Sequence, residues 1–493
     1  MSPSFYEEFQ AHLPTFRNTC RALPYRWPHP IRRVAIIGAG PTGLACAFAL
    51  REANQRAQQQ GQPEPFTTIQ VFEQNSHPGG TWNYSDQVDD SVTFPSVDPY
   101  GPTPDTPTSK NDCFVGNIYH DLHTNLPTNV MCFPDQPFSN QVPDFPHHSA
   151  VLQYLRTYVH DKDLGSLIEF NTRAILLEWT ETIQTWHCEL ATTATAVAAT
   201  SSHSTPTTRT EQFDAVVVCT GHFNVPYVPD LPGLREVAQN DSHCQLIHSR
   251  QYKLASTTAS DRTVLVIGGG PSGHDIIREI LPFARQFDAQ QAQESDGVAQ
   301  RAPFVPCAAL VGFDPDNRRV RFADGRSIPL PDVVVFATGY LYSVPFLPHQ
   351  SDHHQQEKLP HPSPETTLIT SGRQVHNLFF QLFYLPIPTL CFLSLMSRIA
   401  PFPMAYYQGH LVASVYAGQT LLPEETIMRR LYHQEIQGLE EGGQRHLFEA
   451  KEVAYKDAIA AWIDDPAVVP AVSAEWVQIR RAAKELRKQH LGY

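Results

Sequence analysis

The sequence has no pair of cysteines at Cys-x-x-Cys spacing, although nine cysteines are scattered along its 493 residues. That spacing is typical of redox-active dithiols, so its absence argues against a dithiol enzyme. Single cysteines inside apolar runs are typical of reduced thiols in a cytosolic protein. We therefore expect a cytoplasmic location, with peripheral attachment to the endoplasmic reticulum as the alternative.

Long runs of lysine or arginine are also missing, and the formal net charge is −14. A protein that binds nucleic acid needs a positively charged surface, so this composition argues against such a partner. Among the 23 histidines, His147 and His148 are adjacent, but no cysteine or carboxylate recurs at ligand spacing. We therefore expect no bound metal.

Neither a secretory signal nor a membrane span is apparent. The N-terminus has no basic start followed by an apolar core. The most apolar stretch, residues 377–397, is interrupted by Gln381, Pro386 and Pro388. Because a spanning helix needs about twenty mostly apolar residues, we expect this stretch to be a buried core segment.

The length of the chain predicts several domains, about two to four. Four stretches have the composition of surface insertions, which cannot supply a hydrophobic core. They are rich in glutamine, proline, or threonine, serine and alanine, and comprise residues 55–65, 98–112, 191–211 and 286–300.

Two glycine-rich loops each follow an aliphatic run, residues 34–37 and 264–267, and precede an apolar helical pattern. A strand, a tight glycine turn and a helix in this order are typical of the Rossmann fold, in which the helix N-terminus binds a dinucleotide pyrophosphate. Two copies predict two bound dinucleotides. The first loop is Gly38, Ala39, Gly40, Pro41, Thr42 and Gly43, and the second is Gly268, Gly269, Gly270, Pro271, Ser272 and Gly273.

Further buried strands follow the loops. Residues 68–73 form an apolar strand pattern that ends in Glu73, which suits a carboxylate that accepts hydrogen bonds from a ribose. Residues 215–221 and 333–339 each end in Thr-Gly, where the backbone passes close to a cofactor or a domain junction.

The order of these elements predicts an α/β protein with two Rossmann-like domains, the second inserted into the first. Glycine and proline cluster where the chain would cross between domains, which favours hinges there. The predicted parts are residues 1–225, 226–339 and 340–493, with hinges at 221–232 and 339–345.

Several motifs beyond the glycine loops resemble those of the flavin-containing monooxygenases, and the chain is most similar to their soluble yeast thiol-specific type. The similarity is collinear over most of residues 31–425, and the Thr-Asn-x-Pro block is its most specific part. The motifs are Gly79-Gly80-Thr81-Trp82, residues 119–127, Phe145-Pro146-His147-His148, residues 338–346 and Pro388-Thr389-Leu390.

The resemblance implies that the outer domain binds FAD and the inserted domain binds NADP. The FAD site would then include Thr81, Trp82, Thr124, Asn125 and Leu126 besides the first loop and Glu73. The NADP site would comprise Gly268, Gly270, Ser272, Gly273, His274 and Asp275.

The resemblance also implies the chemistry. NADPH reduces the flavin, dioxygen gives a carbon-4a hydroperoxide, and a soft nucleophile such as a thiol, other sulfur or amine nitrogen attacks it, as in N,N-dimethylaniline monooxygenases. Asn125 would be the catalytic residue, because in the family its equivalent lies beside flavin and nicotinamide. A turn-capping role is the alternative.

One family element departs from the pattern. Ser242 and Cys244 replace a phenylalanine and a glycine of the fingerprint before the second loop, whereas His248 and Tyr252 fit it. The role of these two residues therefore stays open. So does the residue that binds the NADP 2′-phosphate, for which the candidates are Arg278, Arg285 and Arg301.

Three other functions compete with this interpretation. A Baeyer-Villiger oxygenase would share both cofactors, and so would a reductase of the thioredoxin-reductase kind, although that enzyme needs a cysteine pair beside the flavin. A non-enzymatic sensor of NADP is the third. The oligomeric state also stays open, with a homodimer as one alternative.

Overall fold

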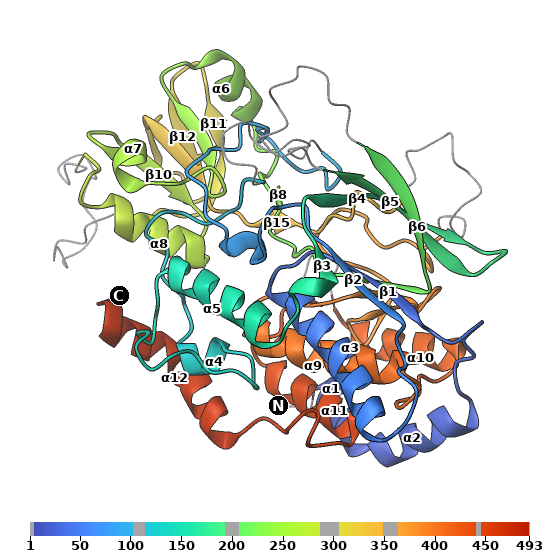
Figure 1. Cartoon of the computed structure of the whole chain (residues 1–493). Coiled ribbons are helices and arrows are strands. Elements are labelled where there is room, and N and C mark those ends of the chain that lie inside the picture. Colours follow the sequence, from blue (N-terminus) through green and yellow to red (C-terminus); the bar gives the residue numbers. More distant parts are fainter. Residues whose placement is uncertain are drawn as a thin grey trace.

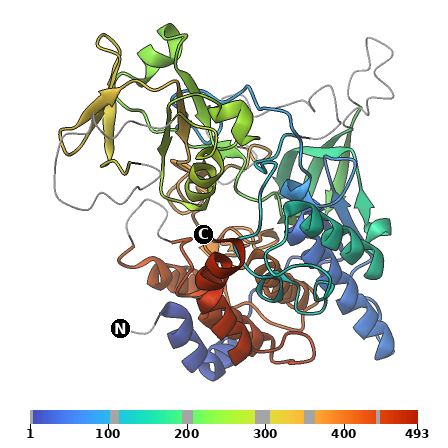
Figure 2. The same ribbon diagram turned by 90° about the vertical axis from the view of Figure 1, so that its left-hand side faces the viewer.

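The computed structural model describes residues 4–101, 114–192, 207–285, 305–348, 363–439 and 445–492. Two sheets with mostly parallel strands organise this part of the chain, and each predicted glycine loop follows a strand of one of them (Figure 1). The prediction of an α/β protein with two Rossmann-like domains is therefore confirmed. Figure 2 shows the smaller domain above the larger one, with the C-terminus between them.

The larger sheet has the strand order β16-β17-β18-β7-β1-β2-β3. Strand β1 pairs in parallel with β2 and β7, and its residues Val34 to Ile37 are buried. Such aliphatic burial on both faces is typical of a parallel strand. The strands are β1 (Arg33–Ile37), β2 (Thr68–Phe72), β3 (Ile168–Glu169), β7 (Ala215–Val218), β16 (Leu378–Phe379), β17 (Phe383–Tyr384) and β18 (Leu390–Phe392).

Residues from both ends of the chain build this domain. Helix α3 (Pro41–Gln59) packs against α9 (Pro401–Tyr416) so closely that a Cβ atom at Gly409 would lie 3.1 Å from the Cα of Cys46. Part of the glutamine-rich stretch predicted to be a loop continues α3 to Gln59, because glutamine is a good helix former. The other helices are α1 (Phe5–Ala11), α2 (Leu13–Ala22), α4 (Thr128–Met131), α5 (His148–Asp161), α10 (Glu425–Ile436), α11 (Glu452–Ile463) and α12 (Ala474–Leu491).

An antiparallel sheet covers one face of the larger sheet, and apolar side chains of the two sheets form a common buried cluster. Its strands are β4 (Thr172–Thr180), β5 (Thr185–Thr192) and β6 (Thr208–Phe213). The apolar stretch at residues 377–397 forms β16 to β18, and most of its side chains are buried, as predicted. Among the described residues, no helix has both the length and the apolar character that a bilayer crossing requires.

The smaller parallel sheet has the order β10-β14-β9. Apolar side chains are buried on both of its faces. Its strands are β9 (Gln245–His248), β10 (Val264–Ile267) and β14 (Val333–Phe336), with helices α6 (Leu234–Asn240), α7 (Ala255–Ala259) and α8 (Pro271–Ile280) and an antiparallel sheet of β11 (Leu310–Asp314), β12 (Arg319–Phe322) and β13 (Ser327–Pro329).

The chain leaves and re-enters the larger domain at one place. Strands β8 (Val225–Pro226) and β15 (Tyr340–Leu341) pair with each other in antiparallel fashion. Both lie within the segments predicted to be hinges. The inserted domain is thus joined to the larger one by two paired linkers, and the exact domain bounds stay a prediction.

Candidate cofactor sites

The first glycine loop connects β1 to α3 with no room for side chains at two of its glycines. Gly38 has a φ of +104°, and a Cβ atom there would lie 2.8 Å from the carbonyl oxygen of Cys219. A Cβ atom at Gly43 would lie 1.9 Å from the carbonyl oxygen of Gly38. Only glycine permits this turn and this close approach of helix to strand. Pro41 occupies the first turn of α3 and Thr42 is buried behind it.

The second loop repeats the geometry between β10 and α8. Gly268 has a φ of +119°, and a Cβ atom at Gly273 would lie 2.1 Å from the carbonyl oxygen of Gly268. By contrast, a Cβ atom at Gly269 or Gly270 would meet no heavy atom within 4 Å. The loop therefore leaves open space in front of the helix N-terminus, which fits a bound pyrophosphate.

Glu73 lies directly behind the first loop. Its carboxylate accepts hydrogen bonds from the backbone N–H of Ala39 at 2.7 Å and from the backbone and side-chain nitrogens of Asn75, both at 2.9 Å. Burial raises the pKa of Glu73, and these hydrogen bonds oppose the rise. A carboxylate accepts about four hydrogen bonds, so one position is left for a ribose hydroxyl.

The Gly79-Gly80-Thr81-Trp82 motif lies against the first loop. Gly80 has a φ of +55°, and a Cβ atom there would lie 2.9 Å from the Cα of Gly40. The half-buried ring of Trp82 packs edge-on against Phe402 at the start of α9, and the exposed Thr81 donates a hydrogen bond to the side-chain oxygen of Asn117. The structure thus brings this motif and the loop together, as a shared FAD site requires.

The Thr124-Asn125-Leu126 turn is fixed from both sides. The backbone N–H of Thr124 donates to the carbonyl oxygen of Pro146 at 3.0 Å, and its hydroxyl donates to the carbonyl oxygen of Leu126 at 2.9 Å. Thr124 and Leu126 are buried, whereas Asn125 between them is exposed. A rigid turn therefore presents the Asn125 amide outward.

His274 and Asp275 differ in their surroundings, although both follow the second loop. His274 is exposed, whereas Asp275 is buried. The carboxylate of Asp275 accepts hydrogen bonds from the hydroxyl of Tyr119 and the guanidinium of Arg487. Asp275, which was predicted to bind the cofactor, thus already accepts hydrogen bonds from two distant segments of the protein.

His248 and Tyr252 both make hydrogen bonds to other residues of the protein. His248 is fully buried, and its Nε2 lies 3.0 Å from the carbonyl oxygen of Gly339. Burial lowers its pKa to about 4, so the ring is neutral at physiological pH. Tyr252 donates to Glu279 at 2.8 Å. Both residues therefore help to fix the inserted domain.

Two buried basic residues, Arg250 and Lys253, join the two domains, and no sequence motif indicated them. Arg250 donates from Nε to Asp89 at 2.7 Å, and the side chains are 5% and 2% exposed. Lys253 donates to the carbonyl oxygens of Gly116 and Ile118, and burial lowers its pKa to about 8. No short motif could mark these residues, because their partners are more than a hundred residues away in the sequence.

The pKa of Glu279, which accepts the hydrogen bond from Tyr252, yields a prediction about stability. Burial raises the pKa of Glu279 to about 7 from an ordinary 4.5, with Asp121 and Asp275 adding to the rise and Tyr252 and Arg278 opposing it. The folded state therefore holds a proton that the unfolded state loses between pH 4.5 and 7, so stability falls as pH rises through this window.

We expect Glu279→Gln to stabilise the protein by about 1–2 kcal/mol at pH 8 and to have no such effect below pH 4.5. Glutamine retains an acceptor for Tyr252 and carries no charge. Apparent melting temperatures at both pH values measure the effect, with Glu485→Gln at an exposed position as the control. An equal change at both pH values would contradict this explanation.

Three thiols that are distant in the sequence meet beneath the first loop. Cys219 hydrogen-bonds Cys46 and is also close to Cys391. Burial raises the pKa of Cys219 well above its ordinary value, so the thiol stays protonated. The structure thus supplies a cysteine cluster that spacing did not reveal, but it is buried and unreactive rather than poised for dithiol chemistry.

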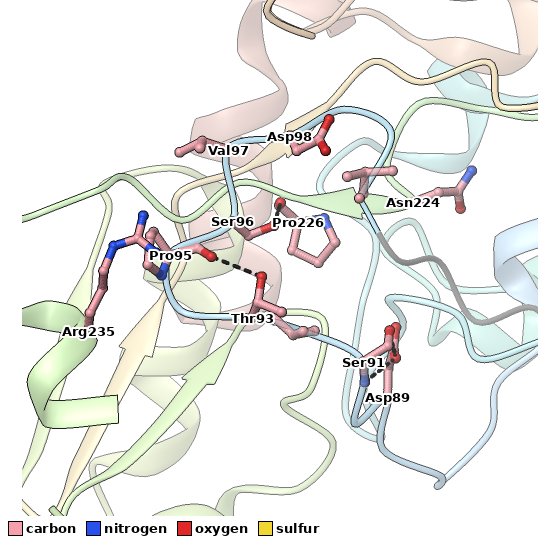
Figure 3. Close-up of a pocket in the computed structure, with 13 residues that line it drawn as sticks. Asp89, Ser91, Thr93, Pro95, Ser96, Val97, Asp98, Asn224, Pro226 and Arg235 are labelled. Carbon is pink, nitrogen blue, oxygen red and sulfur yellow. Dashed lines mark hydrogen bonds between the residues drawn. The ribbon is translucent and has the colours of Figure 1, made fainter. Parts of the chain in front are cut away.

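A pocket of about 160 Å³ opens beside the linkers (Figure 3). Its walls come from residues 89–101 and 224–226, with Arg235 at one side. The hydroxyls of Thr93 and Ser96 already donate to the carbonyl oxygens of Pro95 and Pro226. None of the predicted site residues lines this pocket, so it is separate from both glycine loops.

The 2′-phosphate ligand stays unassigned. Arg278 lies on α8 with Nη2 3.6 Å from Glu279, and Arg285 donates to the carbonyl oxygen of Asp261. Arg301 lies outside the described residues. Within the described ranges, no group of three histidine, cysteine or acidic side chains is arranged to hold a metal ion.

Two family models match the chain. One, described as flavin-binding monooxygenase-like, covers residues 108–294, and the other, an NAD(P)-binding Rossmann-like domain, covers residues 36–103. The second match falls on the loop predicted to bind FAD. Because FAD and NAD(P) share an ADP half, this pattern alone does not discriminate between them.

Relatives that match most of the chain point to the same family. The chain is 24% identical to a flavin-containing monooxygenase of Aspergillus flavus over 92% of this chain and 97% of the relative. It is 27% identical to the thiol-specific monooxygenase of Saccharomyces cerevisiae over 78% and 77% of the two chains. Its fold is similar to that of S-allyl-L-cysteine S-oxygenase from Allium sativum, with a TM-score of 0.70, 24% identity and coverage of 93% and 94%. The chain thus resembles the flavin-containing monooxygenases, a family of flavin-dependent oxidoreductases, and its cofactors are FAD and NADPH.

Proposed function

We propose that the protein uses NADPH and dioxygen to oxygenate soft nucleophiles, with thiols and other sulfur compounds first and amine nitrogen second. One observation carries this proposal, a chain of contacts between the two cofactor sites. Thr81, next to the first loop, bonds Asn117, and the side chain of Asn117 also hydrogen-bonds Tyr340. Tyr340 follows the Thr-Gly turn that ends β14. These contacts support the proposal that a flavin at the first loop and a nicotinamide at the second lie within reach of one another.

The glycine loops would hold the two pyrophosphates, FAD at Gly38 to Gly43 and NADP at Gly268 to Gly273. In each loop the N-terminal N–H groups of the following helix favour a bound anion. When bound, FAD supplies the redox chemistry, namely acceptance of electrons from NADPH and activation of dioxygen. The protein itself then needs no nucleophile or paired carboxylates.

The residues around Asn125 would supply orientation and a dry environment. The exposed Asn125 amide can donate one hydrogen bond to the oxygen being transferred. The half-buried Trp82, which packs on the buried Phe402, offers apolar surface near the first loop, and exclusion of water strengthens such a hydrogen bond. The substrate class is supported by the thiol-specific relative, and access to the site rather than a dedicated binding pocket would select the substrate.

Purified protein should be yellow and should oxidise NADPH with oxygen uptake that rises on addition of cysteamine, glutathione or methimazole. Formation of the oxygenated sulfur product should match the NADPH consumed. A protein without flavin, or without NADPH-driven oxygen uptake, would overturn the proposal. A lactone formed from a cyclic ketone would indicate Baeyer-Villiger chemistry, and anaerobic transfer of electrons to a protein disulfide would indicate a reductase.

A further inference from the structure

The C-terminal helix α12 carries none of the motifs that resemble the family, yet it contacts α4, beside the Asn125 turn, and Asp275, beside the second loop. Most of its surface is exposed, and Ala483 is its one buried residue among those described. Near its start, the indole N–H of Trp476 donates to the carbonyl oxygen of Val130 at 3.1 Å. Val130 belongs to α4, which directly follows the turn that presents Asn125.

The other end of α12 reaches the second nucleotide loop. Arg487 Nη2 donates to both oxygens of Asp275, at 2.9 and 3.2 Å, and the side chains are 13% and 8% exposed. Tyr119 donates to the same carboxylate at 2.7 Å. Asp275 is two residues after Gly273 in α8, and both ribbon views place the C-terminus beside that helix (Figures 1 and 2).

We propose that α12 fixes α8 relative to the larger domain, and that Arg487 and Tyr119 are positioning residues for the nicotinamide dinucleotide. This inference rests on the proposed function in one respect, the assignment of that dinucleotide to the second loop. A carboxylate held by donors from two outside segments cannot move without losing charge-assisted hydrogen bonds. Asp275 therefore ties the helix N-terminus that faces the pyrophosphate to the segment that carries Asn125.

The same contacts explain why Asp275 need not touch the dinucleotide. Its carboxylate would repel a pyrophosphate placed nearby unless a cation neutralised it. Arg487 supplies that cation. The inferred role of the pair is thus twofold, since it holds α8 in place and balances the acidic charge beside the loop.

Arg487→Ala tests the inference, with Arg481→Ala as a control that removes the same charge from an exposed position of α12. We expect Arg487→Ala to retain its FAD and to bind NADP⁺ about tenfold more weakly, equivalent to about 1.4 kcal/mol. Titration of the flavin spectrum with NADP⁺ measures this affinity. Hydrogen exchange of the α8 backbone amides should also become about tenfold faster in this variant, whether or not NADP⁺ is present.

A double-mutant cycle with Asp275→Asn separates this role from a general loss of stability. If Arg487 acts through Asp275, the double variant should bind NADP⁺ no more weakly than the single variant with the lower affinity. Unchanged exchange in α8 after Arg487→Ala, or additive losses in the cycle, would overturn the inference. If the wild-type protein itself fails to bind NADP⁺, the proposed function fails, and the exchange measurement still tests the role of α12.

Discussion

Gly40→Ala is expected to yield a folded protein that binds FAD about tenfold to a hundredfold more weakly than the wild type. The structure has room for the substitution, because a Cβ atom at Gly40 would lie 3.5 Å from the Cα of Gly80, an ordinary contact, and no closer atom is present. The added methyl group would instead occupy the space in which the pyrophosphate approaches the backbone. The flavin absorbance of the purified protein measures the loss.

Gly270→Ala is the corresponding change in the second loop, where a Cβ atom would meet nothing within 4 Å. We expect it to retain FAD and to weaken NADPH binding by about the same factor. Gly165→Ala, at another position with open space, is the control and should affect neither cofactor. A loss of NADPH binding from the Gly40 variant with FAD retained would reverse the assignment of the two loops.

Gly43 and Gly273 are less suitable for this test. A Cβ atom at either position would collide with the backbone of its own loop at 1.9 or 2.1 Å, so alanine there disturbs the fold even without a cofactor. A loss of flavin in such a variant would report on the turn rather than on the binding site. The comparison of Gly40 with Gly270 avoids this ambiguity.

Asn125→Ala is expected to separate NADPH oxidation from oxygenation. Loss of one preorganised hydrogen-bond donor costs about 10²-fold in the step that it assists. We expect NADPH consumption to continue, with hydrogen peroxide released in place of most of the oxygenated product. Parallel assays of NADPH, hydrogen peroxide and product measure the ratio. Most of the FAD should be retained, because the first loop and Glu73, which would hold the pyrophosphate and the ribose, are untouched.

Asn129→Ala is a matched control for this variant, since Asn129 is exposed on α4 four residues further along the chain. It should keep the product yield of the wild type. If Asn125→Ala also keeps that yield, the turn has only a structural role and the catalytic prediction is wrong. A protein that binds NADP⁺ but shows no oxygenation even as the wild type would favour the sensor hypothesis.

Local patterns were enough to predict the strand, glycine turn and helix at both loops. A buried strand, a glycine turn and a helix are consecutive in sequence, and the clashes at Gly43 and Gly273 show why no other residue fits there. The insertion of one domain into the other also followed from the order of strands along the chain. Composition was a poorer guide at residues 55–59, which looked like part of a loop and form the end of α3.

The contacts between domains could not be predicted in this way. Asp89 and Arg250 are 161 residues apart, and Asp275 and Arg487 are 212 residues apart. No short motif marks such pairs, because their meaning arises only when the chain has folded. The cysteine cluster is a further example, since Cys46 and Cys219 meet although no spacing rule connects them.

Neighbouring residues set the backbone geometry of the two Rossmann-like folds, so both could be predicted from sequence patterns. How those folds face one another depends on contacts that form only in the folded chain. Asn117 joins the two proposed sites, Arg250 and Lys253 fix the junction, and α12 reaches across to α8. The reason is physical: buried charges and polar groups need partners, and the folded chain supplies them from distant segments.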